Sequence, residues 1–186
     1  MPNTASTTNA KTRNTKPASK ATPKDAIAML KVEHAEARDA LRELKESTER
    51  ATAKREKILA KVAPALWVHM QIEEEIFYPA FEEALKTSDD EVKSIEARAE
   101  HQSAKAALSA LEAADAGSTE FRAYAKVVFD LVDHHASEEE DEMFPRVRKL
   151  IGKDELVALG ERMAARRDEL MASGDFRRDD EEREPN

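Results

Sequence analysis

The sequence contains no cysteine among its 186 residues. Without thiols there can be no disulfide framework, no iron–sulfur cluster and no thiolate zinc site. Glycine is scarce too, with four residues, and aromatic residues make up only 5% of the chain. This composition favours helices over strands. We therefore expect a mostly α-helical domain in which any bound metal is held by nitrogen and oxygen.

Long apolar runs are also missing. No run approaches the ~20 residues of a membrane-spanning helix, and residues 1–22 lack the apolar region of a secretory signal. These absences predict a cytoplasmic protein with no membrane partner. The net charge of −9 argues against nucleic acid as the main partner of the folded part, because phosphate binding needs a basic face.

The two ends of the chain differ in composition from the middle. Residues 1–22 carry four basic residues and no acid, which predicts a disordered tail that could touch nucleic acid only weakly. Residues 174–186 predict a disordered, charged tail. Between them we expect a helical bundle over residues 23–151 and a C-terminal helix packed on it over residues 152–173.

Apolar residues recur at intervals of three and four through most of the middle, which is the pattern of one helix face. The pattern breaks near residues 47–52, at Lys86–Ser88, at Gly117 and at Gly152. Short links between long helices force neighbours to run in opposite directions. The fold class we predict is therefore all-α: an antiparallel up-down-up-down four-helix bundle with a short fifth helix at the C-terminus.

Local signals suggest where these helices begin and end. Thr22 has the features of an N-cap followed by proline, Ser88 to Glu91 has the spacing of a capping box, and Ser118 is a third cap. Pro79 and Pro145 lie inside helical pattern. They predict that the second and fourth helices end or kink there, because proline has no N–H for the helix ladder.

The sequence contains an internal repeat. EHAEARDALREL at 33–44 aligns with EHQSAKAALSAL at 100–111, and HMQIEEEIFYP at 69–79 aligns with HASEEEDEMFP at 135–145. The first histidines of the two blocks are separated by 35 residues in one copy and by 34 in the other. This spacing indicates a duplicated helical hairpin.

The stretch DHHASEEEDEMFP offers two His/Glu pairs with a spacing of four residues: His134 with Glu138, and His135 with Glu139. Counted back from the proline, the second pair matches His69 and Glu73 of the first copy, whereas His134 matches Val68. A helical wheel also places the second pair within the apolar arc. We therefore predict that the second pair points inward and that His134 is a surface or supporting residue.

Six residues are thus predicted to meet inside the bundle as metal ligands: His34, His69, Glu73, His101, His135 and Glu139. Buried carboxylates and imidazoles need a positive partner, and this donor set suits iron, manganese or zinc. If both glutamates bridge two ions and each ion takes two histidines, one bridging oxide or hydroxide leaves a coordination position open for a small ligand.

The remaining acids of the two repeats are predicted to form a solvated face: Glu74, Glu75, Glu138, Glu140, Asp141 and Glu142. The aromatic residues, Trp67 and Tyr78 among them, are predicted to lie in the core. Glu74 and Glu140 occupy matching positions in the two copies.

At these motifs the sequence resembles the hemerythrin family, specifically the bacterial hemerythrin-like proteins with HHE cation-binding domains. The resemblance covers roughly residues 24–150. It implies a non-heme diiron centre with a bridging oxygen, in which Glu73 and Glu139 are the bridging carboxylates. Oxygen carriers of the family have an extra histidine on the third helix, four residues after the first, and Lys105 stands at that position here. This departure argues against reversible oxygen carriage.

Three functions follow from this sequence. The first is a metal-binding protein with two iron ions, or manganese or zinc instead, that binds or senses dioxygen, nitric oxide or iron. The second is a diiron enzyme that detoxifies peroxide or nitric oxide under oxidative stress, similar to a catalase or peroxidase. The third is a structural or interaction module in which the bound metal stabilises the folded bundle.

Overall fold

The computed structural model describes residues 25–176 and contains only helices and their connections over that range. Its elements are α1 (Ala26–Glu46), α2 (Thr52–Ile72), the π-helical turn η1 (Glu73–Phe77), α3 (Tyr78–Ala84), α4 (Ser88–Ala113), α5 (Thr119–Glu138), the π-helical turn η2 (Glu139–Met143), α6 (Phe144–Leu150) and α7 (Lys153–Ser173). The all-α prediction is confirmed. The predicted tails at 1–22 and 177–186 lie outside the described residues.

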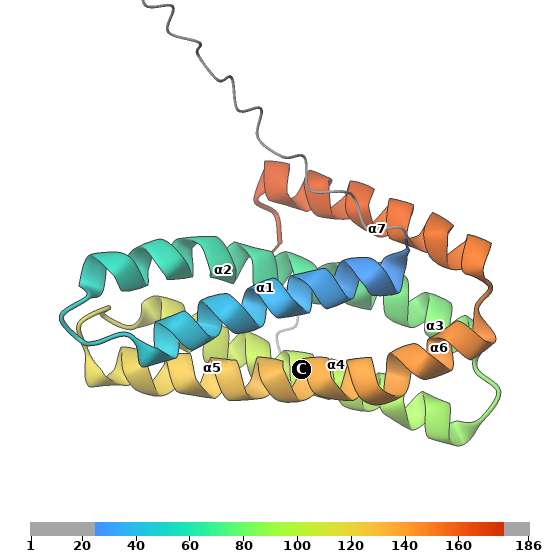
Figure 1. Cartoon of the computed structure of the whole chain (residues 1–186), viewed down its shortest axis with the longest axis horizontal. Helices are drawn as coiled ribbons and strands as arrows, with labels where there is room; N and C mark the ends of the chain where they lie inside the picture. Colours follow the sequence, from blue (N-terminus) through green and yellow to red (C-terminus); the bar gives the residue numbers. More distant parts are fainter. Residues whose placement is uncertain (1–24, 177–186) are drawn as a thin grey trace, which may run out of the picture.

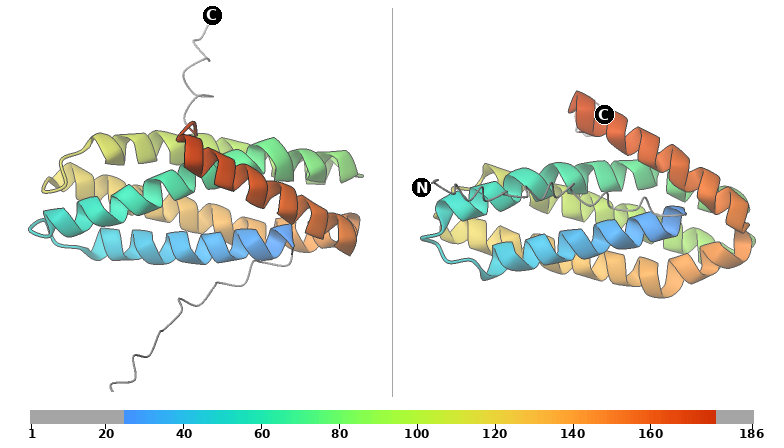
Figure 2. Two further views of the ribbon diagram at one scale, coloured as in Figure 1. Left: turned by 90° about the horizontal axis from the view of Figure 1, so that it is seen from above. Right: turned by 45° about the horizontal axis from the view of Figure 1, so that its top comes forward.

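The centre of the molecule is surrounded by α1, α2, α4 and α5 (Figure 1). Helix α1 packs against α2 and α5, and α4 packs against the same two helices. Because the connections are short, this ring runs up, down, up and down, as predicted. Helix α7 lies outside the ring and crosses α1 and α2 obliquely (Figure 2).

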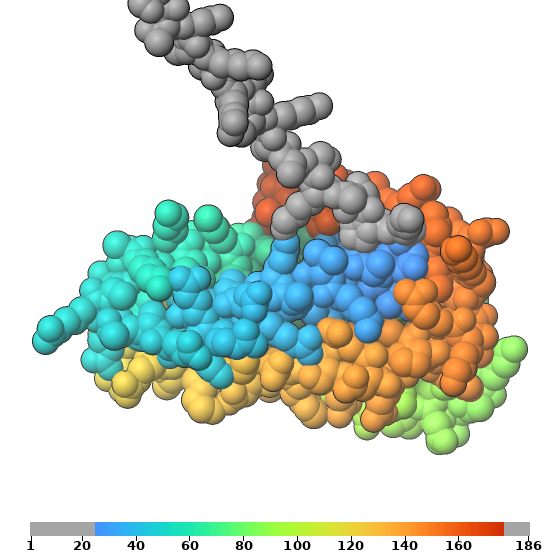
Figure 3. All heavy atoms as spheres, viewed as in Figure 1, coloured from blue at the N-terminus to red at the C-terminus, as the bar shows by residue number. Residues whose placement is uncertain are grey.

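Two apolar clusters hold the bundle together, one on each side of the middle. The first contains Phe77, Phe81 and Phe144 and includes the inner face of α7. The second, toward the other end, contains Leu44, Leu108 and Phe121 among its members. Side chains of α1 lie directly against those of α5 and α6 along the front of the molecule (Figure 3). The polar residues of the repeats lie between these two clusters.

Helix α7 is held close to the bundle at one glycine. A Cβ atom added at Gly160 would lie 2.7 Å from the backbone nitrogen of Ala26. Apolar side chains on either side of this contact, Leu156, Leu159 and Met163, are buried in the first cluster. Close contact between backbones requires glycine here.

Two predicted N-caps differ from those of the structure, although α4 begins at Ser88 as predicted. The N-cap of α1 is Asp25, whose carboxylate accepts from the N–H of Ala28 at 2.8 Å. The predicted cap, Thr22, lies outside the described residues. The cap of α4 is Thr87 rather than Ser88, because the Thr87 hydroxyl accepts from the N–H of Asp90. Both true caps fit the same chemistry, in which an oxygen satisfies a free backbone N–H. The predicted cap at Ser118 is confirmed.

The two prolines follow wide turns rather than ending their helices. In η1 the carbonyl of Glu73 accepts from the N–H of Tyr78, five residues on, and in η2 Glu139 accepts from Phe144 in the same way. The chain then continues as α3 and α6, which begin next to Pro79 and Pro145, and α6 bends away from α5 (Figure 2, right). A π turn accommodates the missing proline N–H and often marks a functional site.

None of the helices within residues 25–176 combines the length and the apolar character needed to cross a membrane. The cytoplasmic location stays a prediction.

Candidate metal centre

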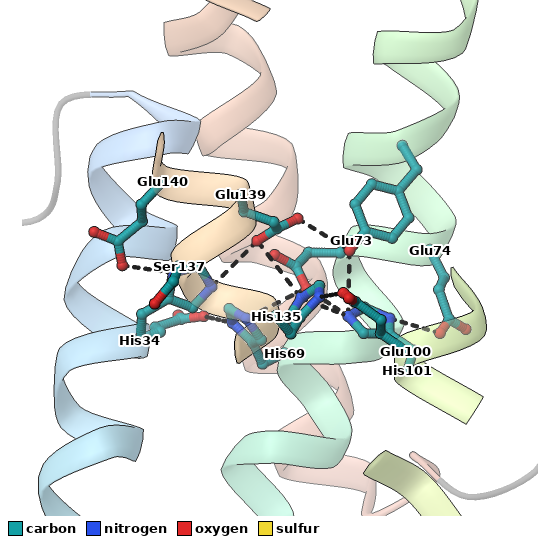
Figure 4. A network of polar contacts seen from close by, with 12 residues as sticks. His34, His69, Glu73, Glu74, Glu100, His101, His135, Ser137, Glu139 and Glu140 are labelled. Carbon is teal, nitrogen blue, oxygen red and sulfur yellow. Dashed lines mark hydrogen bonds and ion pairs between the residues drawn. The ribbon is translucent and has the colours of Figure 1, made fainter. Parts of the chain in front are cut away.

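All six predicted ligands meet in the middle of the bundle (Figure 4). Each of the helices α1, α2, α4 and α5 contributes one histidine, and each π turn contributes a glutamate as its first residue. None of the six is more than 7% exposed: His34, His69, Glu73, His101, His135 and Glu139. The repeat therefore predicted which residues come together.

Each glutamate lies between two histidines from different helices. One Glu73 oxygen, Oε2, is 3.3 Å from Nε2 of His69 and 3.3 Å from Nε2 of His101. Oε2 of Glu139 is 3.3 Å from Nε2 of His34 and 3.6 Å from Nε2 of His135. All four imidazoles thus present the same nitrogen, Nε2, to the centre.

The histidines form two neighbouring pairs. The ring centroids of His34 and His69 are 4.9 Å apart, and those of His101 and His135 are 4.5 Å apart. In the second pair the two Nε2 atoms approach to 3.0 Å. Each carboxylate contacts one histidine of each pair, so it joins the two halves of the centre.

Several atoms in this buried cluster have no hydrogen-bond partner. They are Nε2 of His34 and His69, both carboxylate oxygens of Glu73, and Oε2 of Glu139. Buried polar atoms without partners cost stability. A cation between the two carboxylates would satisfy them together, so the residues fit a metal site held by nitrogen and oxygen.

The two carboxylates perturb each other strongly. Burial raises the pKa of Glu73 well above its ordinary value, and the nearby Glu139 raises it further. Burial also opposes ionisation of Glu139, but His135 and His34 outweigh it and hold the pKa of Glu139 below its ordinary value. Without a cation only one member of this pair is therefore readily ionised.

Burial also affects the imidazoles. It lowers the pKa of His101, with help from His135, and it lowers the pKa of His34 despite the neighbouring Glu139. For His135 burial acts in the same direction, yet Glu139 and Glu100 outweigh it and raise the pKa. The neutral imidazoles of His34 and His101 are the form that binds metal.

A second ring of carboxylates holds the outer nitrogen of every histidine. Nδ1 lies within 3.1 Å of a glutamate oxygen in each case: His34 with Glu140, His69 with Glu33, His101 with Glu74, and His135 with Glu100. Such contacts fix the tautomer and orientation of a metal-binding imidazole and strengthen its basicity. Each carboxylate comes from the neighbouring helical segment, so the ring closes around the bundle.

This second ring was only partly visible in the sequence. The prediction of a solvated face is wrong for Glu74 and Glu140, which are half-buried and hold histidines. It is right for Glu75, Asp141 and Glu142, which are exposed. Glu33 and Glu100 precede the histidines of the two EH pairs. Their recurrence at the same position in both copies is the signal in the sequence that could have identified them.

Cations outside the second ring hold three of its carboxylates. Arg167 of α7 donates to Glu33 at 3.1 Å, Arg38 donates to Glu140 at 2.7 Å, and Lys105 donates to Glu74 at 3.0 Å. Lys105 thus supports the carboxylate of His101 where an oxygen carrier would have a further histidine.

The fourth carboxylate, Glu100, has a histidine as its outer neighbour. Nε2 of His134 lies 3.3 Å from Glu100, and the His134 side chain is 62% exposed. His134 therefore points away from the centre, in the register that the repeat predicted.

Tyr78 is the one phenol at this centre among the described residues. Its hydroxyl donates to Oε1 of Glu139 at 3.0 Å and lies 3.2 Å from Nε2 of His101. Burial and the charge of Glu139 raise the pKa of Tyr78 well above its ordinary value. The prediction that Tyr78 is a core residue is right about its burial. The direction of its hydroxyl depends on how the helices pack and has no signal in the sequence.

Comparisons with known proteins indicate a cation-binding domain. The family model described as the hemerythrin HHE cation binding domain matches residues 25–147. A solved structure of an HHE cation-binding domain-containing protein from Mycobacterium kansasii is similar, with a TM-score of 0.68 and 27% sequence identity, over 80% of this chain and 88% of that chain. No curated protein sequence matched the chain.

Proposed function

Because the chain belongs to the hemerythrin HHE cation-binding family, we propose that its metal centre holds two iron ions and binds or senses dioxygen, nitric oxide or iron. The six residues of the centre would hold the ions: His34, His69, Glu73, His101, His135 and Glu139. When bound, two iron ions supply redox chemistry and a coordination position for a small ligand.

One observation carries the two-ion proposal. Each of Glu73 and Glu139 contacts one histidine of each pair, which is the arrangement expected of carboxylates that bridge two ions. A single ion could be held by the four residues whose ligand atoms lie within 4.8 Å of one another, His34, Glu73, His135 and Glu139. It would leave His69 and His101 without a positive partner. Two ions, each with two imidazoles and a share of both carboxylates, would satisfy the cluster.

A mostly apolar cavity borders one histidine of this centre. A cavity of about 560 Å³ lies between α1, α2 and α7, and His69 and Glu33 form part of its wall. Most of the other lining side chains are apolar, such as Met29, Val62 and Leu66. Dioxygen and nitric oxide are small and weakly polar, so such a lining suits them better than it suits ions.

The test begins with metal analysis of protein purified without added metal. Two iron ions per chain are expected, together with an optical spectrum that changes on reduction. The reduced protein is then mixed with dioxygen or nitric oxide in a stopped-flow spectrometer. A spectral change on mixing supports binding, and a protein that shows no change with either gas contradicts the proposed ligand function.

A second candidate function is detoxification of peroxide or nitric oxide at the same centre. Tyr78 favours it, because a buried hydroxyl that donates to Glu139 can hold a proton beside the reacting position. Catalytic turnover of peroxide that is lost in Glu73→Ala and His135→Ala would support this function. Reaction with a single equivalent of peroxide and no turnover would count against it.

The purely structural alternative predicts that metal matters only for folding. Chelation should then lower the melting temperature, while the loaded protein reacts with none of the gases or peroxide. Melting that does not change on chelation excludes this alternative.

A further inference from the structure

The two copies of the duplicated hairpin differ in the residues on one matching helix face. In the first copy, the positions matching His134 and Glu138 are Val68 and Ile72. Both are buried in the apolar cluster that includes the inner face of α7. In the second copy no described helix covers the corresponding face, and a histidine and a glutamate replace the two apolar residues.

The open face carries a group of metal-ligand type. Nε2 of His134 lies 3.3 Å from Oε1 of Glu100 and 3.5 Å from Oε1 of Glu138. One imidazole and two carboxylates come within 4.8 Å of one another there. Imidazole nitrogen together with carboxylate oxygen is a donor set that divalent transition-metal ions accept.

A narrow crevice lies beside Glu100 and Glu138 of this group. It measures about 10 Å³, which is roughly the space of one water molecule. Its wall contains Glu100 and Glu138 near the surface and Glu139 at depth. Glu139 is 1% exposed, and its Oε2 atom has no hydrogen-bond partner. Two residues of the candidate cation site, Glu100 and Glu138, therefore line the same crevice as a buried carboxylate of the metal centre.

The charges along this crevice favour a cation. The crevice is lined by four carboxylates and one ammonium group: Glu96, Glu100, Glu138, Glu139 and Lys93. The ammonium group of Lys93 already pairs with Glu142, so the carboxylates remain in excess. A cleft lined by charge of one sign raises the local concentration of the opposite ion and its rate of association.

We propose that Glu100, His134 and Glu138 form a capture site for divalent metal ions, which pass from it along the crevice between α4 and α5 to the buried centre. The inference rests on the proposed function, because it assumes that the centre takes up metal. Glu100 is suited to a transfer role, since its other oxygen holds His135 at 2.9 Å. The opposite face, where the cavity between α1, α2 and α7 has a mostly apolar lining, would not serve as the entry for ions.

The experiment measures how fast metal-free protein takes up Co²⁺. The test variant is His134→Ala combined with Glu138→Gln, which leaves Glu100 and all six residues of the centre in place. The control is Glu120→Gln, an equal loss of charge at an exposed position near the start of α5. Uptake is followed by visible absorption after rapid mixing, and the final metal content is measured separately.

The double variant should fill the centre to the same final content as the wild type, at a rate lower by roughly tenfold at low ionic strength. The control should load at the wild-type rate, and added salt should narrow the difference. Equal rates for the double variant and the wild type would overturn the capture site. A lower final content would overturn it too, because the residues would then belong to the centre itself.

The same measurements distinguish failure of the proposed two-ion centre from failure of the capture site. If the wild type takes up no Co²⁺ and no Fe²⁺, the two-ion centre is wrong and the capture site is wrong with it. If the wild type loads two ions and the double variant loads as fast, the centre stands and only the capture site fails. Far-ultraviolet circular dichroism of the double variant should match the wild type, since both substituted side chains are at least 45% exposed.

Discussion

The Nδ1 atom of His135 lies 2.9 Å from a carboxylate oxygen of Glu100, which belongs to the neighbouring helix and precedes it by 35 residues in the chain. The relationship is repeated around the bundle, with one glutamate for each histidine of the centre. Each of the four motifs therefore supplies a candidate ligand and, one residue away, the carboxylate that orients the histidine of the next helix.

Substitution of Glu74 tests this second ring. In Glu74→Gln, His101 loses its charged partner at 2.8 Å, and the affinity for metal should fall roughly 10- to 100-fold. Competition with a coloured chelator measures the change. The matched control is Glu75→Gln, since Glu75 is the next residue in the chain but pairs with Arg166 of α7. Equal losses of affinity in the two variants would show that Glu74 has no specific role.

The repeat explains why the centre could be predicted while its surroundings could not. A duplicated His and Glu spacing identifies buried positions, because the same residues recur on the same helix face. The partner of a histidine on another helix depends on how the helices pack. A run such as EEEIF therefore does not reveal which of the two acids after Glu73 reaches the histidine of the next helix. The wide turns η1 and η2 were missed for a similar reason. The two prolines indicated a break in the ladder, but not that one extra residue per turn would resolve it.

The N-caps of α1 and α4 also depend on packing that the local sequence does not reveal. Side-chain oxygens suited to an N-cap are present at four positions near these helix starts: Thr22, Asp25, Thr87 and Ser88. The choice among them depends on where the first buried residue of the helix must lie, as Ala26 does against Gly160 of α7. Packing therefore selects one cap among several that the local sequence allows.

Substitution of the adjacent histidines His134 and His135 tests the register. His134→Ala should leave two metal ions per chain at equilibrium, because this side chain is 62% exposed. His135→Ala should lower the content below two, since it removes an Nε2 donor from the centre. Metal content after dialysis measures both. Loss of metal in His134→Ala with full occupancy in His135→Ala would reverse the assigned register.

Gly160→Ala tests the contact between α7 and α1. The new methyl group would lie 2.7 Å from the nitrogen of Ala26, which is backbone and cannot turn aside. The free energy of unfolding should fall by about 1–3 kcal/mol, despite the better helix propensity of alanine. Urea denaturation measures it. Gly152→Ala is the control, because a Cβ there meets no atom within 4 Å, and its cost should stay under about 1 kcal/mol. An unchanged stability of Gly160→Ala would contradict the close approach.

Glu73→Gln should separate stability from metal binding. In the metal-free protein, burial raises the pKa of Glu73 well above its ordinary value of 4.5, so folding favours the protonated carboxyl. The stability that this group contributes is present below pH 4.5 and is lost as the pH rises through the raised pKa. A neutral glutamine removes that loss. At pH 7 the metal-free variant should therefore be more stable than the metal-free wild type, by about 1–3 kcal/mol.

The same substitution should lower the metal content below two ions, because a neutral amide replaces the carboxylate between His69 and His101. Urea denaturation of the metal-free proteins between pH 4 and pH 8 tests the sign, since the advantage of the variant should grow with pH. The control Glu75→Gln should act in the opposite direction, because Arg166 lowers the pKa of Glu75. If the metal-free Glu73→Gln protein is less stable than the wild type at pH 7, ionisation of Glu73 beside Glu139 does not destabilise the metal-free protein. The unpartnered carboxylate of Glu73 would then not explain why the site binds metal.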